Sequence, residues 1–145
     1  MAIDPKYWPQ VGVGVAVWRG EEILLVKRNT EPWIGQWSLP GGRQQPGETV
    51  RETASREVYE ESALTVTPTT LIDVVDLITY GKDGSIQYHY TLVGFNAEWL
   101  AGDACAGDDA ADVCWMRLGQ LERIDMWQET RRIVRLSYSQ RAPKV

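Results

Sequence analysis

The stretch "GGRQQPGETVRETASREVYEESAL", Gly41 to Leu64, decides the fold because it joins a glycine- and proline-rich turn to a helix rich in carboxylates. From Thr49 to about Ser62 the residues are good helix formers, and Glu48 and Glu52 suit the positive end of the helix dipole. We therefore expect one well-defined helix that begins directly after an irregular turn.

The end of this helix carries an unusual density of negative charge from Glu57, Glu60 and Glu61. At about 100° per residue the three carboxylates share one arc of the helix. Glu57 and Glu61 form a like-charge i,i+4 pair, and Glu60 and Glu61 lie near the negative end of the dipole, so both arrangements disfavour the helix. Arg56 offsets this by pairing with Glu52 or Glu60 at i,i+4. A solvated face held by ion pairs is one interpretation. A bound Mg²⁺ or Mn²⁺ ion explains the arrangement better, because these ions prefer hard carboxylate oxygens.

The turn before the helix reads "LPGGRQQPGE", Leu39 to Glu48. Its glycines and prolines around Arg43 allow the backbone to approach a ligand closely. A free backbone carbonyl such as that of Gly41 could complete a metal shell. Taken alone, this stretch indicates no more than turns.

Turn and helix together resemble the Nudix box, G-x5-E-x7-R-E-U-x-E-E-x-G-U with U aliphatic. Gly42, Glu48 and the run from Arg56 to Leu64 match it at every catalytic position. The one departure is Ala63, where the family has glycine. If Ala63 adopts a left-handed helix cap, it costs about 1 kcal/mol of stability without touching the carboxylates.

The resemblance extends beyond the box, because "LLVKR", "GQWSLPGG", "YHYTLVGF" and "AGDDAADVCWM" are similar to bacterial Nudix hydrolases of the ADP-ribose pyrophosphatase type. It implies a Nudix fold, with a central mixed β-sheet flanked by helices. Strands and helices are mixed rather than strictly alternating along the chain, which independently indicates an α+β class, a mixed α/β/α sandwich. A length of 145 residues fits one domain spanning 1–145.

The resemblance also implies roles for the box residues and two or more Mg²⁺ or Mn²⁺ ions. The implied metal ligands are Glu57, Glu61, Glu60 and the carbonyl of Gly41. Arg56 is expected to pair with Glu48 or Glu52 and so to orient the carboxylates. The general base is either a box glutamate or an acidic residue of the later loop, Asp108 or Asp109.

Candidate substrate-binding residues flank the box: Arg28, Trp33, Trp37, Gly42 and Arg43. Trp33 and Trp37 either stack on a nucleobase, which is worth about 1–3 kcal/mol per base, or pack in the core. Arg28 or its neighbour Lys27 reaches phosphate, and the other is a surface residue. His89 is expected to be a strand residue without a catalytic role.

The implied reaction is hydrolysis of a nucleoside diphosphate linked to another group, with ADP-ribose cleaved to AMP and ribose 5-phosphate. Many enzymes of that specificity have a proline where this chain has Thr79 and Tyr80, and a tyrosine there is more typical of dinucleoside polyphosphate hydrolases. Oxidised nucleoside triphosphates are a further alternative. A non-catalytic nucleotide sensor is a rival from another class, which the intact glutamates disfavour.

The net charge of −5 argues against binding to nucleic acid polymers or anionic membranes, which requires clustered Lys and Arg. The start "MAIDPKYWPQ" lacks the apolar core of a signal peptide, and no run is long enough for a membrane helix. We therefore expect a cytoplasmic protein with a small-molecule partner, and the family's habits favour a homodimer. Cys105 and Cys114 show no metal or disulfide spacing.

Periodicity predicts the remaining elements. They are a hairpin of Val11–Trp18 and Glu22–Arg28, an ordered but irregular loop over Asn29–Glu48, strands on either side of the turn Gly81–Ser85, a loop over Leu100–Asp112, a strand Val113–Arg117 and a closing helix. Pro68 marks an edge, a bend or a bulge.

Overall fold

A computed structural model describes residues 8–31, 33–107 and 110–141. Its strands are β1 Gln10–Arg19, β2 Glu22–Arg28, β3 Trp37–Ser38, β4 Gly41–Arg43, β5 Thr65–Tyr80, β6 Ile86–Ala101 and β7 Ala110–Arg117. Its helices are α1 Val50–Ser62, a 3-10 helix Leu118–Arg123 and α2 Gln128–Gln140.

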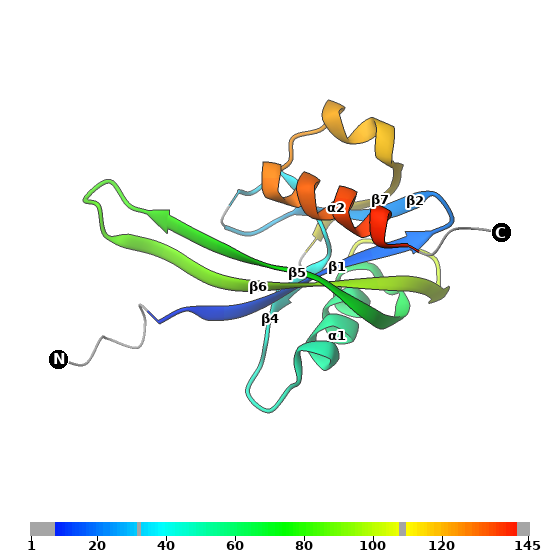
Figure 1. Ribbon diagram of the computed structural model, residues 1–145, viewed down its shortest axis with the longest axis horizontal. Coiled ribbons are helices and arrows are strands. Elements are labelled where there is room, and N and C mark those ends of the chain that lie inside the picture. The colour runs from blue at the N-terminus through cyan, green and yellow to red at the C-terminus, as the bar shows by residue number, and fades with distance from the viewer. Residues whose placement is uncertain (1–7, 32, 108–109, 142–145) are drawn as a thin grey trace.

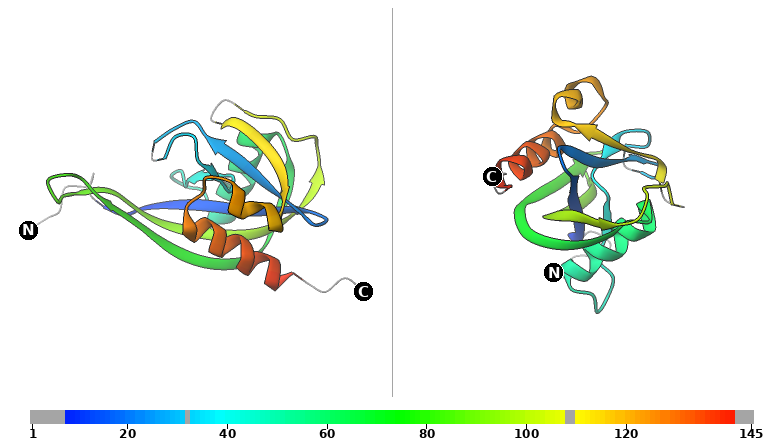
Figure 2. Two further views of the ribbon diagram at one scale, coloured as in Figure 1. Left: turned by 90° about the horizontal axis from the view of Figure 1, so that it is seen from above. Right: turned by 90° about the vertical axis from the view of Figure 1, so that its right-hand side faces the viewer.

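The strands form one mixed sheet in the order β3-β2-β1-β6-β5, with β4 paired to β1 and β7 paired to β2. β1 and β6 run parallel, and the other pairs are antiparallel. Figure 1 shows α1 below the sheet and α2 above it, and the views in Figure 2 agree. This arrangement confirms the α+β class with helices on both faces of a mixed sheet.

Alternation along β1 builds two cores, one under each helix. Val13, Val15 and Val17 pack with Ala54 and Val58 of α1. The intervening residues Ala16 and Trp18 pack with Ile133 and Val134 of α2. Because successive strand residues point to opposite faces, a single central strand holds both helices in place.

Helix α1 begins and ends where the sequence predicts. At its N-terminus the Thr49 side chain accepts a hydrogen bond from the Glu52 N–H, and the Glu52 carboxylate accepts one from the Thr49 N–H, forming a capping box. At its C-terminus Ala63 has φ 63°, and its N–H donates to the Tyr59 carbonyl. The left-handed cap of the family pattern is therefore present in spite of the Cβ of Ala63.

The hairpin of β5 and β6 confirms the predicted turn at Gly81–Ser85 and extends beyond the rest of the sheet (Figure 1). β5 lies at the end of the strand order, and its register shifts between Pro68 and Leu71. The proline therefore occupies both an edge strand and an irregularity, where its missing N–H costs least.

Two boundaries differ from the sequence expectation. The loop 29–48 contains the short strands β3 and β4, because glycines let its backbone pair closely: a Cβ on Gly41 would lie 1.8 Å from the Val13 carbonyl oxygen. β7 begins at Ala110 rather than at Val113, since its pairing with β2 continues through an irregularity at Lys27 and Arg28. Cys105 and Cys114 are both free thiols. No helix in the described ranges is long and apolar enough to cross a membrane.

Candidate functional site

A cleft of about 980 Å³ opens between the box turn, α1 and the beginning of α2. Small-molecule sites commonly have about this volume. The predicted residues that line it are Arg28, Trp33, Trp37, Gly41, Gly42, Arg43, Glu57 and Glu61. Segments far apart in sequence thus meet around one hollow, as the resemblance implies.

Glu61 is the buried carboxyl of this cleft, with 8% of its surface exposed. Burial, and then the negative charge of neighbouring Glu57, raises the pKa of Glu61 to about 8. The N–H of Gly41 donates to Glu61 Oε1 at 3.4 Å, and this bond and the charge of Arg28 act in the opposite direction on the pKa. Glu57 and Glu61, the like-charge pair predicted from sequence, therefore interact where the Glu61 carboxyl is largely shielded from water.

Glu57 lies directly against the box turn. A Cβ built on Gly42 would lie 2.4 Å from Cδ of Glu57, so position 42 has no room for a side chain. The glycine is thus required by the carboxylate that packs on it, beyond any need for turn flexibility.

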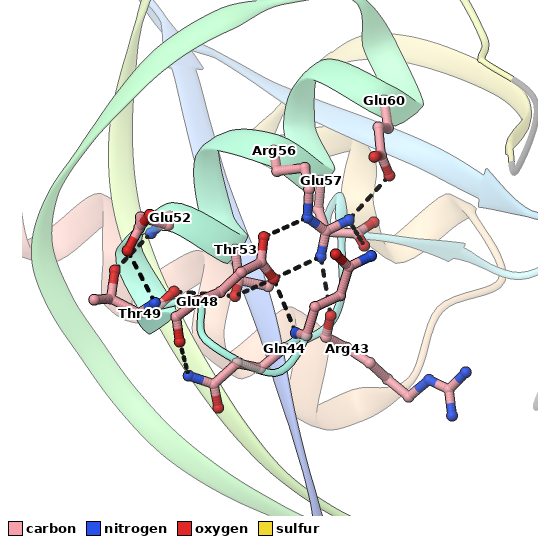
Figure 3. Close-up of polar contacts among 10 residues, drawn as sticks. Arg43, Gln44, Glu48, Thr49, Glu52, Thr53, Arg56, Glu57 and Glu60 are labelled. Carbon is pink, nitrogen blue, oxygen red and sulfur yellow. Dashed lines mark hydrogen bonds and ion pairs between the residues drawn. The ribbon is translucent and has the colours of Figure 1, made fainter.

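Arg56 organises the carboxylates around it (Figure 3). Its Nε lies 2.6 Å from Glu48 Oε2, and its Nη1 lies 2.8 Å from Glu57 Oε1 and 3.1 Å from Glu60 Oε2. Of the predicted partners, Glu48 and Glu60 pair with Arg56, whereas Glu52 belongs to the capping box. Hydrogen bonding to Arg56 lowers the pKa of Glu48 to about 2.

The residues fit a divalent cation, although their present arrangement is not a closed cage. Across 8–31, 33–107 and 110–141, no three His, Cys, Asp or Glu side chains converge closely enough to hold a metal ion as they stand. Glu60 is 46% exposed and paired with Arg56. The charge of Glu57 raises the pKa of Glu61 beside the cleft, and the donor set consists of oxygens, the chemistry that Mg²⁺ and Mn²⁺ prefer.

The later acidic loop reaches the end of α1. Asp108 and Asp109 themselves lie outside the described residues. The Gly107 N–H donates to the Glu61 carbonyl at 2.9 Å, and a Cβ on Gly107 would lie 1.8 Å from the Glu60 carbonyl oxygen. This contact was not anticipated from sequence, where Gly107 looks like an ordinary loop glycine.

The two loop tryptophans have different environments. Trp37 packs against the core under α2, and its backbone N–H donates to the Asp125 carbonyl at 2.9 Å. Trp33 pairs instead with Trp127, with ring centroids 5.1 Å apart and ring planes at 40°. Trp127 also lines the cleft, although the sequence indicated only packing for it. In the sequence, only its position just before the predicted closing helix could have indicated a role at the cleft.

The basic candidates also differ in where their side chains lie. Arg28 lines the cleft, and its charge reaches Glu61. Lys27 lines it too, so both cations face the hollow. Arg43 is exposed and donates to Gln10 Oε1 at 3.1 Å. His89 is a β6 residue opposite Ile78, as expected for a strand position.

Comparisons with known proteins agree with this geometry. The model of the NUDIX domain matches residues 8–136. The chain is 32% identical over 116 residues to an ADP-ribose pyrophosphatase of Methanocaldococcus jannaschii, covering 80% of this chain and 66% of that protein. It is 33% identical over 117 residues to a putative 8-oxo-dGTP diphosphatase 2 of Mycobacterium tuberculosis, covering 80% of this chain and 79% of the relative.

A solved structure shows the same fold. The MutT NUDIX hydrolase from Burkholderia pseudomallei superposes with a TM-score of 0.74 at 30% identity, over 89% of this chain and 98% of that one. Nudix hydrolases generally use divalent metal ions such as Mg²⁺. The family match over most of the chain, the box geometry and the shared fold establish that this chain belongs to the Nudix family.

Proposed function

We propose that this protein is a Mg²⁺-dependent pyrophosphohydrolase, with Mn²⁺ as an alternative metal, that cleaves a nucleoside diphosphate linked to another group. The observation that carries this proposal is the placement of the buried Glu61 carboxyl beside Glu57 at a cleft of nucleotide size, where burial and the charge of Glu57 both raise the pKa of Glu61. A protein does not gain stability from such a pair. A function at the phosphates of a bound nucleotide explains it.

Glu57 and Glu61 would hold the metal, with Glu60 and the Gly41 carbonyl as further ligands. Bound divalent ions would neutralise charge on the nonbridging phosphate oxygens and lower the pKa of an attacking water. Arg56 is a positioning residue, because it bonds both Glu57 and Glu48 and so fixes the carboxylate geometry. The Arg56 guanidinium also pairs with Glu60, whose side chain would turn from Arg56 toward the ions.

Arg28 and Lys27 would attract the phosphate groups. Both line the cleft, and the charge of Arg28 acts directly on Glu61. The general base is a box glutamate or one of Asp108 and Asp109. The hydrogen bond from Gly107 to the Glu61 carbonyl supports the later loop, because it holds the residue before Asp108 beside α1.

ADP-ribose, cleaved to AMP and ribose 5-phosphate, is the leading substrate. The similarity to an ADP-ribose pyrophosphatase supports it. Tyr80, which favoured dinucleoside polyphosphates in the sequence, is now weaker support for that substrate. It is 64% exposed near the hairpin turn and is not among the residues that line the cleft. Oxidised nucleoside triphosphates are the second candidate, since a putative 8-oxo-dGTP diphosphatase is similar to the same degree.

A nucleotide panel tests this proposal. Initial rates with Mg²⁺ and with Mn²⁺ would be measured for ADP-ribose, diadenosine polyphosphates and 8-oxo-dGTP, with Glu61→Gln as the inactive control. We expect the highest kcat/KM for ADP-ribose, with AMP and ribose 5-phosphate as products. A higher value for 8-oxo-dGTP would assign the second candidate. Turnover no faster than that of Glu61→Gln on every compound would favour a nucleotide-sensing module.

A homodimer and a cytoplasmic location are further parts of this proposal, supported by the family resemblance. Light scattering coupled to size exclusion would test the dimer, and fractionation of the source cells would test the location. A monomer at micromolar concentration would remove the dimer from the proposal without affecting the chemistry.

A further inference from the structure

The last turn of α1 carries two of the three proposed metal-binding carboxylates, those of Glu60 and Glu61. The end of a helix leaves its last backbone carbonyls without partners inside the helix, and such ends fray. This end also lacks the common compensation, because no basic residue lies in the last turn. Carboxylates placed here stay in one position only if another segment supports the end of the helix.

Residues 102–107, which we call the strap, provide this support through their backbone. The Cys105 N–H donates to the Ser62 carbonyl at 3.0 Å, and the Gly107 N–H donates to the Glu61 carbonyl at 2.9 Å. Both acceptors lie where helical partners run out, since α1 ends at Ser62. Two donors of the strap thus replace the N–H groups that a longer helix would supply.

Two glycines allow the strap to approach the helix this closely. A Cβ on Gly107 would lie 1.8 Å from the Glu60 carbonyl oxygen and 3.4 Å from Cα of Glu61. A Cβ on Gly102 would lie 3.0 Å from the Ala63 carbonyl oxygen, and Gly102 has φ 101°, which favours glycine. Position 107 therefore accepts no side chain unless the strap or the end of α1 moves.

The strap is itself fixed on both sides. The Trp99 indole N–H donates to the Gly102 carbonyl at 2.8 Å, and Ala104 packs against the core under α1. At the other end the Ala110 N–H donates to the Gly107 carbonyl at 3.3 Å, and Ala110 begins β7, which pairs with β2. The strap therefore links the end of α1 to strands β6 and β7 of the sheet.

Glu61 is consequently held at both of its ends. Its backbone carbonyl accepts from the Gly107 N–H, and its carboxyl group accepts from the Gly41 N–H at 3.4 Å. A side chain on a fixed backbone samples fewer positions, so less conformational freedom is lost when it binds an ion. Groups that orient metal ligands in this way typically contribute about 10–100-fold to metal affinity.

We propose that the strap is a positioning device for the metal site and that Gly107 is its central positioning residue. It holds the last turn of α1 so that the Glu60 and Glu61 carboxylates can bind the divalent cation together. The inference rests on the proposed function for the presence of that cation. The strap lies outside the stretch Gly42–Leu64 that matches the Nudix box, so it adds a part of the site that the box pattern does not contain.

Mn²⁺ titration, followed by the electron paramagnetic resonance signal of the free ion, measures metal affinity without turnover. Three variants form a graded series: Gly107→Ala with a Cβ contact at 1.8 Å, Gly102→Ala with one at 3.0 Å, and Gly119→Ala with nothing within 4 Å. We expect Mn²⁺ affinity to fall about tenfold in Gly107→Ala, less in Gly102→Ala and not at all in Gly119→Ala. The Mg²⁺ concentration for half-maximal activity should rise in the same order, while KM for the nucleotide at saturating Mg²⁺ stays unchanged.

Leu121→Ala separates positioning from stability. Leu121 is fully buried in the core under α2, so its truncation leaves a cavity and lowers Tm without touching the strap. We expect this variant to bind Mn²⁺ like wild type in spite of its lower Tm. Equal losses of Mn²⁺ affinity in Leu121→Ala and Gly107→Ala would mean that affinity follows stability, and would overturn the positioning role.

The outcomes distinguish the strap from the reaction. Mn²⁺ affinity that is unchanged in Gly107→Ala overturns the strap as a positioning device, and if that variant does not fold, unchanged affinity in Gly102→Ala does so. Mg²⁺-dependent hydrolysis would then keep the proposed function. A protein that binds Mn²⁺, loses affinity in Gly107→Ala and hydrolyses no nucleotide would sink the proposed function and leave the strap standing.

Discussion

The carboxyl group of Glu57 occupies the space in which a side chain at position 42 would begin: a Cβ on Gly42 would lie 2.4 Å from Cδ and 2.6 Å from both carboxylate oxygens. The glycine of the turn and the glutamate of the helix are therefore one unit. The turn fixes where the carboxylate can lie, and the carboxylate fixes which residue the turn can contain.

Gly42→Ala should displace Glu57 and lower kcat/KM by about tenfold or more, because a metal-binding carboxylate tolerates little misplacement. Steady-state kinetics at saturating Mg²⁺ would measure the effect. Gly119→Ala is the control, since a Cβ there meets nothing within 4 Å and its φ is not positive. Wild-type kinetics in Gly42→Ala would show that Glu57 does not need its observed position.

Glu61→Gln should make the metal-free protein more stable while sharply lowering turnover. With a pKa of about 8, the Glu61 carboxyl stays largely protonated in the folded protein near neutral pH, whereas the unfolded chain ionises it, and this difference costs stability. Glutamine has no such cost, and each kcal/mol gained would raise Tm by about 2–4 °C. Thermal melts in EDTA measure the first effect, and we expect activity to fall on the order of a hundredfold or more. Glu60→Gln, at a 46% exposed side chain, separates burial from the helix dipole and should not raise Tm. A lower Tm for Glu61→Gln would contradict this account.

The pairing of Glu48 with Arg56 should appear in the pH dependence of stability. The pKa of Glu48 is lowered from 4.5 to about 2 in the folded protein. The carboxylate therefore stabilises the fold above pH 4.5, and this contribution disappears as the pH falls from 4.5 toward 2. Urea unfolding at several pH values should show Glu48→Gln less stable than wild type at pH 6, with the difference shrinking in acid. Glu98→Gln, whose partner Arg141 lies 3.8 Å away, should show little of this. A difference that grows in acid would reverse the sign of the coupling.

Ala63→Gly should stabilise the protein by about 1 kcal/mol, because the left-handed cap at φ 63° penalises a Cβ. Tm should rise by about 2–4 °C with kcat/KM unchanged. Ala106→Gly is the control, since this exposed residue has no positive φ and a glycine there only adds freedom to the unfolded chain. Destabilisation of both variants alike would mean that the cap is not strained.

Much of the helix and its chemistry was accessible from sequence. The bounds of α1 follow from its residue types, and the pairing of Arg56 with Glu60 follows from spacing, because helix geometry places residues four apart on one face. The left-handed end at Ala63 and the pairing of Arg56 with Glu48 were implied by the resemblance to the Nudix box. The hairpin of β5 and β6 followed from alternation around a glycine-containing turn. The strands β3 and β4 could not be predicted in this way, because such short segments become strands only through their pairing with β2 and β1.

The sequence by itself determined that three carboxylates share one helix face beside a turn without side chains at its glycines, since both properties depend on neighbouring residues along the chain. Only the tertiary structure decided which carboxyl group is buried, which of the two loop tryptophans packs against the core and why Gly107 must be a glycine. Two segments distant in sequence contact Glu61: the Gly41 N–H of β4 donates to its carboxylate, and the Gly107 N–H of the later loop donates to its backbone carbonyl. Trp33 meets Trp127 because the sheet brings the β2–β3 loop to the beginning of α2. Such contacts join segments far apart in sequence, and no local periodicity encodes them.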